Sequence, residues 1–433
     1  MDETRRDHLE LSLAAGEIPA GMKIRIEELA ARTVGLLDFF SPGLGRYTEQ
    51  VGDPRFLQAM GSLLGPALRG GNRVVGLQNG EEIFPSMLEA IRGAQKTITL
   101  ETYIYWSGRI GKEFAETLSD RARAGVATHI LLDWVGSGRI EDALLSEMRA
   151  AGVTITKYHP LGWYNLSRMN NRTHRKLLVV DGKIGFTGGV GIADKWLGNG
   201  QKPDGFRDSH FWLEGPAVAQ MQAAFMDNWM KTEAEVLHGE EYFPQLPPAG
   251  SALAQVFQSS PGEGGESARL MYLLSIACAK ESVRIAASYF VPDNLSVETL
   301  LAARRRGVRI EIIVPGRKTD VEIARRASRS RWGKLLEAEV EIYEYQPAMY
   351  HCKVMIVDDL WVSVGSTNFD SRSFRLNDEA NLNVLDAEFA REQLRVFEED
   401  KKKSRRVTWE MRKNRPWTEK VVERAAGLLR AQL

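Results

Sequence analysis

Two stretches of the chain repeat the same set of chemically reactive side chains. Each reads His-x-Lys-x4-Asp, and the sets are His174, Lys176 and Asp181 in the first copy and His351, Lys353 and Asp358 in the second. A pair of small residues follows each aspartate, Gly188 and Gly189 in one copy and Gly365 and Ser366 in the other. Because two matching copies rarely arise by chance, we interpret the repeat as functional.

These residue types indicate chemistry on an anionic group. One imidazole can act as the nucleophile while the other protonates a leaving oxygen, and both titrate near neutral pH. The two lysines can neutralise the anion in its transition state, so neither a metal nor another cofactor is required. Asn368 and the hydroxyl of Ser366 can donate hydrogen bonds to the same oxygens. The first copy has Gly191 where the second has Asn368, which predicts that the anion cradle is asymmetric or that another residue completes it.

Each copy is predicted to form a strand, a tight turn and a return strand. A histidine and a lysine two residues apart on a strand point to the same face. Asp181 and Asp358 belong to the candidate site by motif, but each begins a turn-prone pair. We therefore interpret them as structural residues that hold the hairpin through side-chain to backbone hydrogen bonds.

Helix-forming and strand-forming stretches alternate ahead of both copies, which predicts an α/β layered domain that occurs twice. A segment rich in Pro, Gly and Ser between residues 240 and 265 marks the seam. The predicted parts are an N-terminal helical extension (1–60), a first lobe (61–245), a second lobe (246–400) and a basic amphipathic C-terminal tail (401–433). Each lobe supplies only one motif histidine and one motif lysine. We therefore expect the lobes to pack face to face around one shared active site.

The duplicated motif resembles the signature of the phospholipase D superfamily. Longer stretches resemble bacterial cardiolipin synthases, and the resemblance spans roughly residues 70–400. The stretches that carry it are ETYIYWSG, GFRDSHFWLEGPAV and AMYHCKVMIVDDLWVSVGSTNFDSRSFRLNDEANL. The resemblance implies two α/β/α lobes of the phospholipase D type.

The resemblance also implies a mechanism with a covalent phosphohistidine. It assigns the nucleophile to His174 and the acid and base steps to His351, although the residues themselves leave the reverse assignment open. It places an acidic residue behind each histidine, with Glu379 matching that position for the second lobe and Asp208 for the first. The implied reaction transfers a phosphatidyl group from one phosphatidylglycerol to another and releases glycerol.

Other acceptors would give other enzymes. If water takes the intermediate, the chain is a hydrolytic phospholipase D or another phosphodiesterase of the superfamily. A nuclease usually carries a basic surplus, whereas 57 basic and 57 acidic residues give this chain a formal net charge of zero. We therefore expect no nucleic-acid partner. A lipid-binding protein without catalysis is disfavoured because both copies keep His, Lys and Asp.

The sequence favours a peripheral protein on the cytoplasmic side of the cell membrane, with an anionic membrane surface as a partner. The first thirty residues do not read as a signal peptide, and no run of 18 apolar residues occurs. Cardiolipin synthases often begin with membrane-spanning helices, and this sequence departs from that form. Candidate membrane-contacting segments are an aromatic loop (158–172), the basic tail and an arginine cluster near the mouth of the site, formed by Arg325, Arg326, Arg329 and Arg331. The alternatives are that the loop closes over the core and that the helix of the tail packs on its own domain, which is the commoner outcome for such a helix.

Overall fold

The computed structural model describes residues 49–158, 171–261 and 266–428. Most of the predicted N-terminal extension and most of the aromatic loop lie outside these residues. Within them, two sets of elements follow the same order along the chain. The first lobe contains β1 (Arg69–Gln78), α4 (Asn79–Gly93), β2 (Thr97–Thr102), α5 (Arg109–Arg123), β3 (Ala127–Asp133), α6 (Asp142–Ala150), β4 (Thr154–Tyr158), β5 (Arg172–Thr173), β6 (Leu177–Val180), β7 (Ile184–Gly188), a 3-10 turn (Asp194–Trp196), β8 (Phe206–Arg207), β9 (Ser209–Glu214) and α7 (Val218–Glu233).

The second lobe repeats this pattern and extends it at the C-terminal end. It contains β10 (Ala252–Ser259), α8 (Ser267–Ala277), β11 (Ser282–Ala287), β12 (Phe290–Val291), α9 (Asn294–Arg305), β13 (Arg309–Pro315), α10 (Glu322–Glu337), β14 (Glu341–Tyr345), β15 (Met349–Tyr350), β16 (Lys353–Val357), β17 (Trp361–Gly365), β18 (Phe369–Asp370), α11 (Ser371–Arg375), β19 (Asn377–Leu385), α12 (Ala387–Lys402), β20 (Ser404–Val407), α13 (Trp409–Lys413) and α14 (Trp417–Leu428).

The strand order shows the duplication directly. The first lobe runs β4-β3-β2-β6-β7-β9-β1, and the second runs β14-β13-β11-β16-β17-β19-β10 with β20 added at its outer edge. In each lobe three parallel strands are followed by the antiparallel motif hairpin. The first strand of each hairpin, β6 or β16, is buried throughout and mainly apolar, as expected for strands covered on both faces. The predicted α/β fold with two repeated lobes is confirmed.

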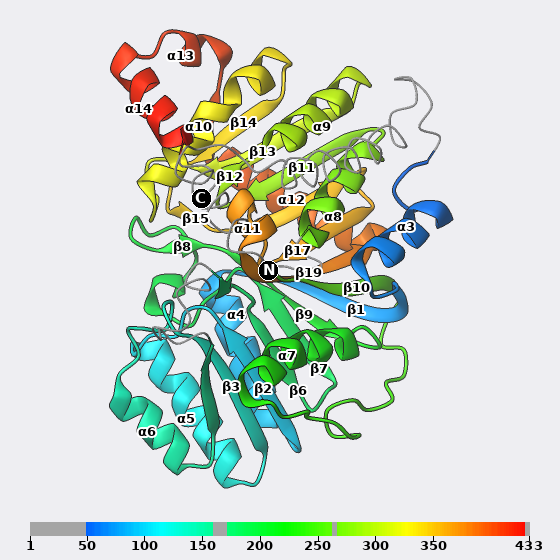
Figure 1. Ribbon diagram of the computed structural model, residues 1–433, viewed down its shortest axis with the longest axis vertical. Coiled ribbons are helices and arrows are strands. Elements are labelled where there is room, and N and C mark those ends of the chain that lie inside the picture. Colours follow the sequence, from blue (N-terminus) through cyan, green and yellow to red (C-terminus); the bar gives the residue numbers. More distant parts are fainter. Residues whose placement is uncertain (1–48, 159–170, 262–265, 429–433) are drawn as a thin grey trace, which may run out of the picture. The chain divides into compact units, whose positions relative to one another are not determined.

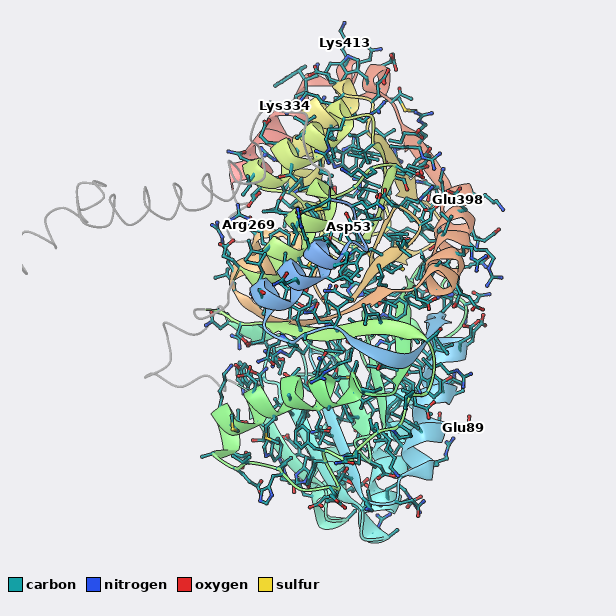
Figure 2. All side chains as sticks on the ribbon, turned by 90° about the vertical axis from the view of Figure 1, so that its right-hand side faces the viewer. Asp53, Glu89, Arg269, Lys334, Glu398 and Lys413 are labelled. Carbon is teal, nitrogen blue, oxygen red and sulfur yellow. The ribbon has the colours of Figure 1, made fainter. Side chains whose placement is uncertain are left out.

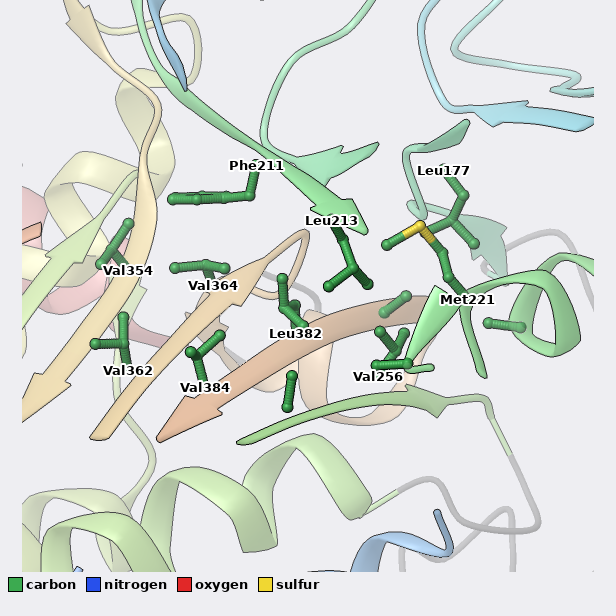
Figure 3. Close-up of a cluster of buried hydrophobic side chains, with 14 of the residues drawn as sticks. Leu177, Phe211, Leu213, Met221, Val256, Val354, Val362, Val364, Leu382 and Val384 are labelled. Atoms are coloured by element: carbon green, nitrogen blue, oxygen red, sulfur yellow. The ribbon is translucent and has the colours of Figure 1, made fainter. Parts of the chain in front are cut away.

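The lobes share one hydrophobic core. β1 pairs with β10 and so joins the two half-sheets, while β7 and β9 lie against β17 and β19 (Figure 1). Figure 3 shows side chains from both lobes in this core, including Phe211 and Leu213 of β9 and Val364 and Leu382 of the second lobe. All four are fully buried. The burial of apolar surface from both sides holds the two half-sheets face to face.

Two short strands cross from one lobe to the other. β5 of the first lobe pairs in parallel with the start of β19, at Asn377 and Asp378. β8 of the first lobe pairs in parallel with β15 of the second lobe. These crossings matter for the site, because β5 and β15 each end directly before a motif histidine.

The described chain ends do not follow the predicted domain boundaries. Helix α3 (Pro54–Leu64) continues past residue 60, and Phe56 packs edge-on against Trp361 of the second lobe with ring centroids 5.0 Å apart. Figure 2 shows this helix, with Asp53 at its start, against the second lobe. At the other end, α12 continues past residue 400, β20 pairs with β14, and α14 packs on α10. Residues 401–428 are therefore part of the second lobe rather than a separate tail.

The motif aspartates tie their hairpins to a neighbouring loop. The carboxylate of Asp181 accepts hydrogen bonds from the backbone N–H groups that begin β2, at Gln95, Lys96 and Thr97. Asp358 accepts the equivalent bonds ahead of β11, from Lys280, Glu281 and Ser282. Both aspartates have a left-handed backbone, with φ of 52° and 51°. The bonds fit a structural role, although they reach an adjacent strand rather than closing the hairpin itself.

Among the described helices, none is both long enough and apolar enough to cross a bilayer.

We expect Asp181→Asn to destabilise the protein without changing its chemistry. Asparagine tolerates the left-handed backbone but turns one acceptor oxygen into a donor facing three N–H groups, which should cost about 1–3 kcal/mol in the free energy of unfolding. Urea unfolding would measure this, with Asp120→Asn as the matched control because Asp120 is exposed and pairs only with Arg123 among side chains. Equal unfolding midpoints, or a loss of turnover per folded molecule, would contradict the structural role.

Candidate active site

Both motif histidines open into one cavity of about 420 Å³. Its wall combines side chains from the two lobes, among them Tyr103, His174, Lys176, Trp196, His351 and Asn368. The structure therefore brings these residues together in one cavity between the lobes, where a single shared site was predicted. Among the described residues, no group of three or more His, Cys, Asp or Glu side chains is arranged to hold a metal ion.

His174 is oriented by the start of β19 in the second lobe. Its backbone N–H donates to the carbonyl oxygen of Asp378 at 2.8 Å. The next side chain on that strand is Glu379, whose two carboxylate oxygens both lie 3.0 Å from Nδ1 of His174. A carboxylate in this position keeps the proton on Nδ1 and leaves Nε2 as the nitrogen with a free lone pair.

His351 is oriented in the same way by the first lobe. Its backbone N–H donates to the carbonyl oxygen of Arg207 at 2.8 Å. Asp208 follows on that segment, and its Oδ2 lies 2.7 Å from Nδ1 of His351. Both carboxylates are fully buried, so each hydrogen bond to a histidine is shielded from water.

The predicted pairing of the carboxylates is therefore wrong. Glu379 was expected behind His351 and Asp208 behind His174, each within its own lobe, but the observed pairs are crossed. The physical reason is the crossing of β5 onto β19 and of β8 onto β15, which brings each histidine to the opposite lobe's carboxylate. Two-residue strands such as these leave no periodic pattern in the sequence.

The lysines lie at the N-terminal ends of the first hairpin strands, and the motif histidines precede these strands. Lys176 precedes β6, and its Nζ donates to the carbonyl oxygen of His174 at 2.6 Å. Lys353 begins β16, donates to the carbonyl oxygen of His351 at 2.6 Å and lies 3.2 Å from Nε2 of that ring. The histidine and lysine of each copy are therefore held side by side by a bond within the motif itself.

The two lysines face different partners. Lys353 donates to the hydroxyl of Ser288 at 3.0 Å, and that hydroxyl donates to Oδ1 of Asn368 at 2.6 Å. Lys176 instead lies over the ring of Tyr103, with Nζ 5.7 Å from its centroid. Ser288 and Tyr103 were not singled out from the sequence. The sequence did contain a signal for both, since each directly follows the parallel strand that borders the motif hairpin of its lobe, and functional side chains often lie in such loops.

Ser366 does not take the predicted place in the anion cradle. Its hydroxyl donates to Oε2 of Glu379 at 2.5 Å, and it does not line the cavity. The counterpart in the first copy is Gly189, where a Cβ atom would lie only 2.2 Å from Oδ1 of Asp208. There the indole of Trp196 supplies the hydrogen bond, with Nε1 2.9 Å from Oδ2 of Asp208. Ser366 and Trp196 thus hold the carboxylates that orient the two histidines.

Trp196 also explains why the first copy lacks an asparagine. A Cβ atom at Gly191 would lie 2.8 Å from Cβ of Ile104 and 3.2 Å from the Trp196 ring. The space taken by Asn368 in the second lobe is therefore filled by apolar side chains in the first. As predicted, the cavity is asymmetric, with an aromatic wall from the first lobe and a more polar wall from the second.

Burial shifts the ionisation of the whole site. Burial lowers the pKa of His174 to about 4 against the opposing effect of Glu379, and burial together with Lys353 lowers the pKa of His351. Burial likewise lowers the pKa of Lys176 to about 7 and that of Lys353 below its usual range.

The two carboxylates respond in the opposite sense. Burial alone would raise the pKa values of Glu379 and Asp208, but the adjacent histidine and lysine charges outweigh it and leave both values below their usual range. Without a ligand the cavity therefore holds ionised carboxylates behind neutral imidazoles, and its ammonium groups lose their protons easily. A bound anion would reverse the last effect, because a nearby negative charge favours the protonated lysine.

Comparison with known proteins places this geometry in a family. A family model described as "Cardiolipin synthase, PLD-like domain" matches residues 87–229 and 272–401. The cardiolipin synthase of Geobacillus kaustophilus is 35% identical over 356 residues, which cover 82% of this chain and 71% of that protein. Cardiolipin synthase 1 of Bacillus anthracis is 34% identical over 358 residues, covering 80% of this chain and 70% of that protein.

A solved structure supports the fold. Phosphatidylserine synthase from Haemophilus influenzae superposes with a TM-score of 0.68 at 14% identity, covering 88% of this chain and 100% of that one. At this identity the likeness concerns the fold alone. The family match over both lobes and the relatives that span most of the chain give one assignment, and the fold agrees with it. The chain belongs to the cardiolipin synthase family of phospholipase D-like enzymes.

Proposed function

We propose that the chain is a phosphatidyltransferase that makes cardiolipin from two molecules of phosphatidylglycerol and releases glycerol. The observation that carries the proposal is the pair of imidazoles on one cavity, each with Nδ1 held by a buried carboxylate of the other lobe. The arrangement leaves both Nε2 atoms for chemistry on one phosphorus centre. The substrate class comes from the relatives, which are named cardiolipin synthases.

In the first step Nε2 of His174 attacks the phosphorus of phosphatidylglycerol. A P–N bond forms, the P–O bond to glycerol breaks, and His351 gives its Nε2 proton to the departing glycerol oxygen. The lowered pKa of His174 keeps that ring neutral and nucleophilic at neutral pH. The incoming phosphodiester carries a negative charge, which raises the pKa of His351 and readies it as the acid.

In the second step a hydroxyl of another phosphatidylglycerol replaces glycerol. His351, now neutral, accepts the proton of that hydroxyl. The hydroxyl oxygen attacks phosphorus, and the P–N bond to His174 breaks. Lys176, Lys353 and Asn368 stabilise the charge on the phosphoryl oxygens in both steps. Ser366 and Trp196 act as positioning residues, because each donates a hydrogen bond to one of the carboxylates that orient the histidines.

The proposed substrates are membrane lipids, so we infer that the chain works at an anionic membrane surface as a peripheral protein on the cytoplasmic side. Helix α14, one of the candidate contact segments, packs on α10 but leaves Trp417 74% exposed. An exposed tryptophan on a lobe surface suits the headgroup region of a bilayer.

Incubation of the purified protein with phosphatidylglycerol vesicles in the presence of a chelator tests the reaction. Mass spectrometry of the lipids should show cardiolipin and an equal amount of glycerol, because two lipids combine and one headgroup leaves. His174→Ala protein is the control and should form neither product. Phosphatidic acid in place of cardiolipin would mean that water is the acceptor and that the chain is a hydrolytic phospholipase D.

The pH profile of kcat/KM should decline on the alkaline side with the loss of at least two protons. His351 must be protonated to act as the acid and has a lowered pKa, and Lys176 loses its charge as pH rises through about 7. In Lys176→Arg the guanidinium stays charged throughout this range, so the decline should become shallower by one proton. An unchanged slope in that variant would show that Lys176 does not have to be charged for turnover.

A further inference from the structure

A second cavity lies across helix α10 from the catalytic cavity, and arginines form much of its lining. It has a volume of about 450 Å³, within the range of small-ligand sites. We call it the arginine cavity, and its arginines are Arg317, Arg325, Arg326, Arg329, Arg405, Arg412 and Arg415. Val321 and Ala324, just before and within α10, line the catalytic cavity instead. This end of the helix is therefore a wall between two separate cavities. None of the four arginines predicted near the mouth of the catalytic site lines that cavity, and three of them line the arginine cavity instead.

Two buried carboxylates organise the arginines. Glu344 pairs with Arg325, Arg329 and Arg405, at 3.0, 2.9 and 2.6 Å. Glu423 pairs with Arg329 at 2.9 Å and with Arg415 at 3.0 Å. These pairs hold the guanidinium groups of α10, β20 and the C-terminal helices in fixed positions around one space.

The carboxylates do not balance the positive charge. The cavity is lined by seven arginines and by the glutamates at 322, 419 and 423, and Glu344 adds one more negative charge. Seven against four leaves a formal excess of three positive charges. Burial lowers the pKa of Arg412, and the neighbouring Arg415 adds to this shift against the opposing effect of Glu423. A partly buried positive excess is costly unless an anion neutralises it.

The fixed guanidinium groups select the kind of anion. A guanidinium presents two parallel N–H donors that match the oxygens of a phosphate group, and several such groups converge here. We propose that the arginine cavity is a second anion-binding site, separate from the catalytic cavity, and that it takes a phosphate group. The group can come from a lipid headgroup or from a phosphate compound in solution.

The rim of the cavity bears on these two sources. Met411 and Val422 line it and are 51% and 40% exposed, and Trp417 nearby on α14 is 74% exposed. Lys413, labelled in Figure 2, lies on the same C-terminal segment. Exposed apolar side chains beside a cationic cavity are suited to a phosphate group that lies in a bilayer surface.

Titration calorimetry with inorganic phosphate tests the site. The double variant R317Q/R326Q removes two exposed arginines that do not pair with Glu344 or Glu423, so the fold should be retained. It should weaken phosphate binding about tenfold or more, as expected for the loss of charge-assisted contacts. The matched control is R55Q/R123Q, which removes the same charge from exposed arginines outside both cavities and should bind as the wild type does.

A second variant and a vesicle assay complete the test. R405Q changes a side chain that reaches the cavity from β20, and it should also weaken phosphate binding. Co-sedimentation with phosphatidylglycerol vesicles, compared with phosphatidylcholine vesicles, identifies the source. Weaker sedimentation of the variants with phosphatidylglycerol would identify a lipid headgroup, and unchanged sedimentation beside weakened phosphate binding would identify a soluble phosphate compound.

Two results would overturn the proposal. One is unchanged phosphate binding in both R317Q/R326Q and R405Q. The other is an equal loss of binding in the R55Q/R123Q control. The catalytic cavity is intact in every variant, so phosphate bound there contributes equally to each titration. Because binding is measured without turnover, the test stands even if the proposed transferase reaction fails.

Discussion

The parallel contacts of β5 with β19 and of β8 with β15 hold each motif histidine against a carboxylate from the opposite lobe. In both cases a backbone N–H bond of 2.8 Å sets the register, and the carboxylate is the side chain that follows the accepting carbonyl. Neither lobe alone could orient its own imidazole. Removing the histidine of such a pair leaves a buried carboxylate without its hydrogen-bond partner, at a cost of about 1–3 kcal/mol or more. The chemistry of the site and the packing of the lobes therefore depend on the same contacts.

Duplication gives the site its symmetry, and local packing then breaks that symmetry. Ser366 supports Glu379, whereas the matching place beside Asp208 has room only for a glycine, and Trp196 supplies the bond. At Gly191 a side chain would meet Ile104 first, with the same indole close behind it. In the proposed reaction one histidine attacks phosphorus and the other transfers protons, so the two histidines require different surroundings. An aromatic wall on one side and a polar wall on the other are consistent with that division.

Much of the fold could be predicted from the sequence. The apolar runs after Lys176 and Lys353 are continuous, and strands and helices alternate ahead of both, so the two α/β lobes follow from local patterns. The crossed carboxylate pairs could not be predicted, because two-residue strands have no periodicity and the contacts join residues about 140 to 200 positions apart. The edge strand β20 after residue 400 was not predicted, because its sequence SRRV is half basic and mostly exposed and so has no apolar alternation.

We infer that the transferred phosphatidyl group is bound covalently to His174 during turnover, in a site formed by both lobes. The most direct measurement is peptide mapping by mass spectrometry of wild-type protein quenched in alkali during its first turnover of phosphatidylglycerol, since a phosphorus–nitrogen bond survives base better than acid. We expect a phosphatidyl adduct, or the glycerophosphoryl group left once alkali has cleaved its acyl esters, on the peptide that contains His174 and none on the peptide that contains His351. An adduct on His351, or none on either peptide in protein that is forming cardiolipin, would contradict it.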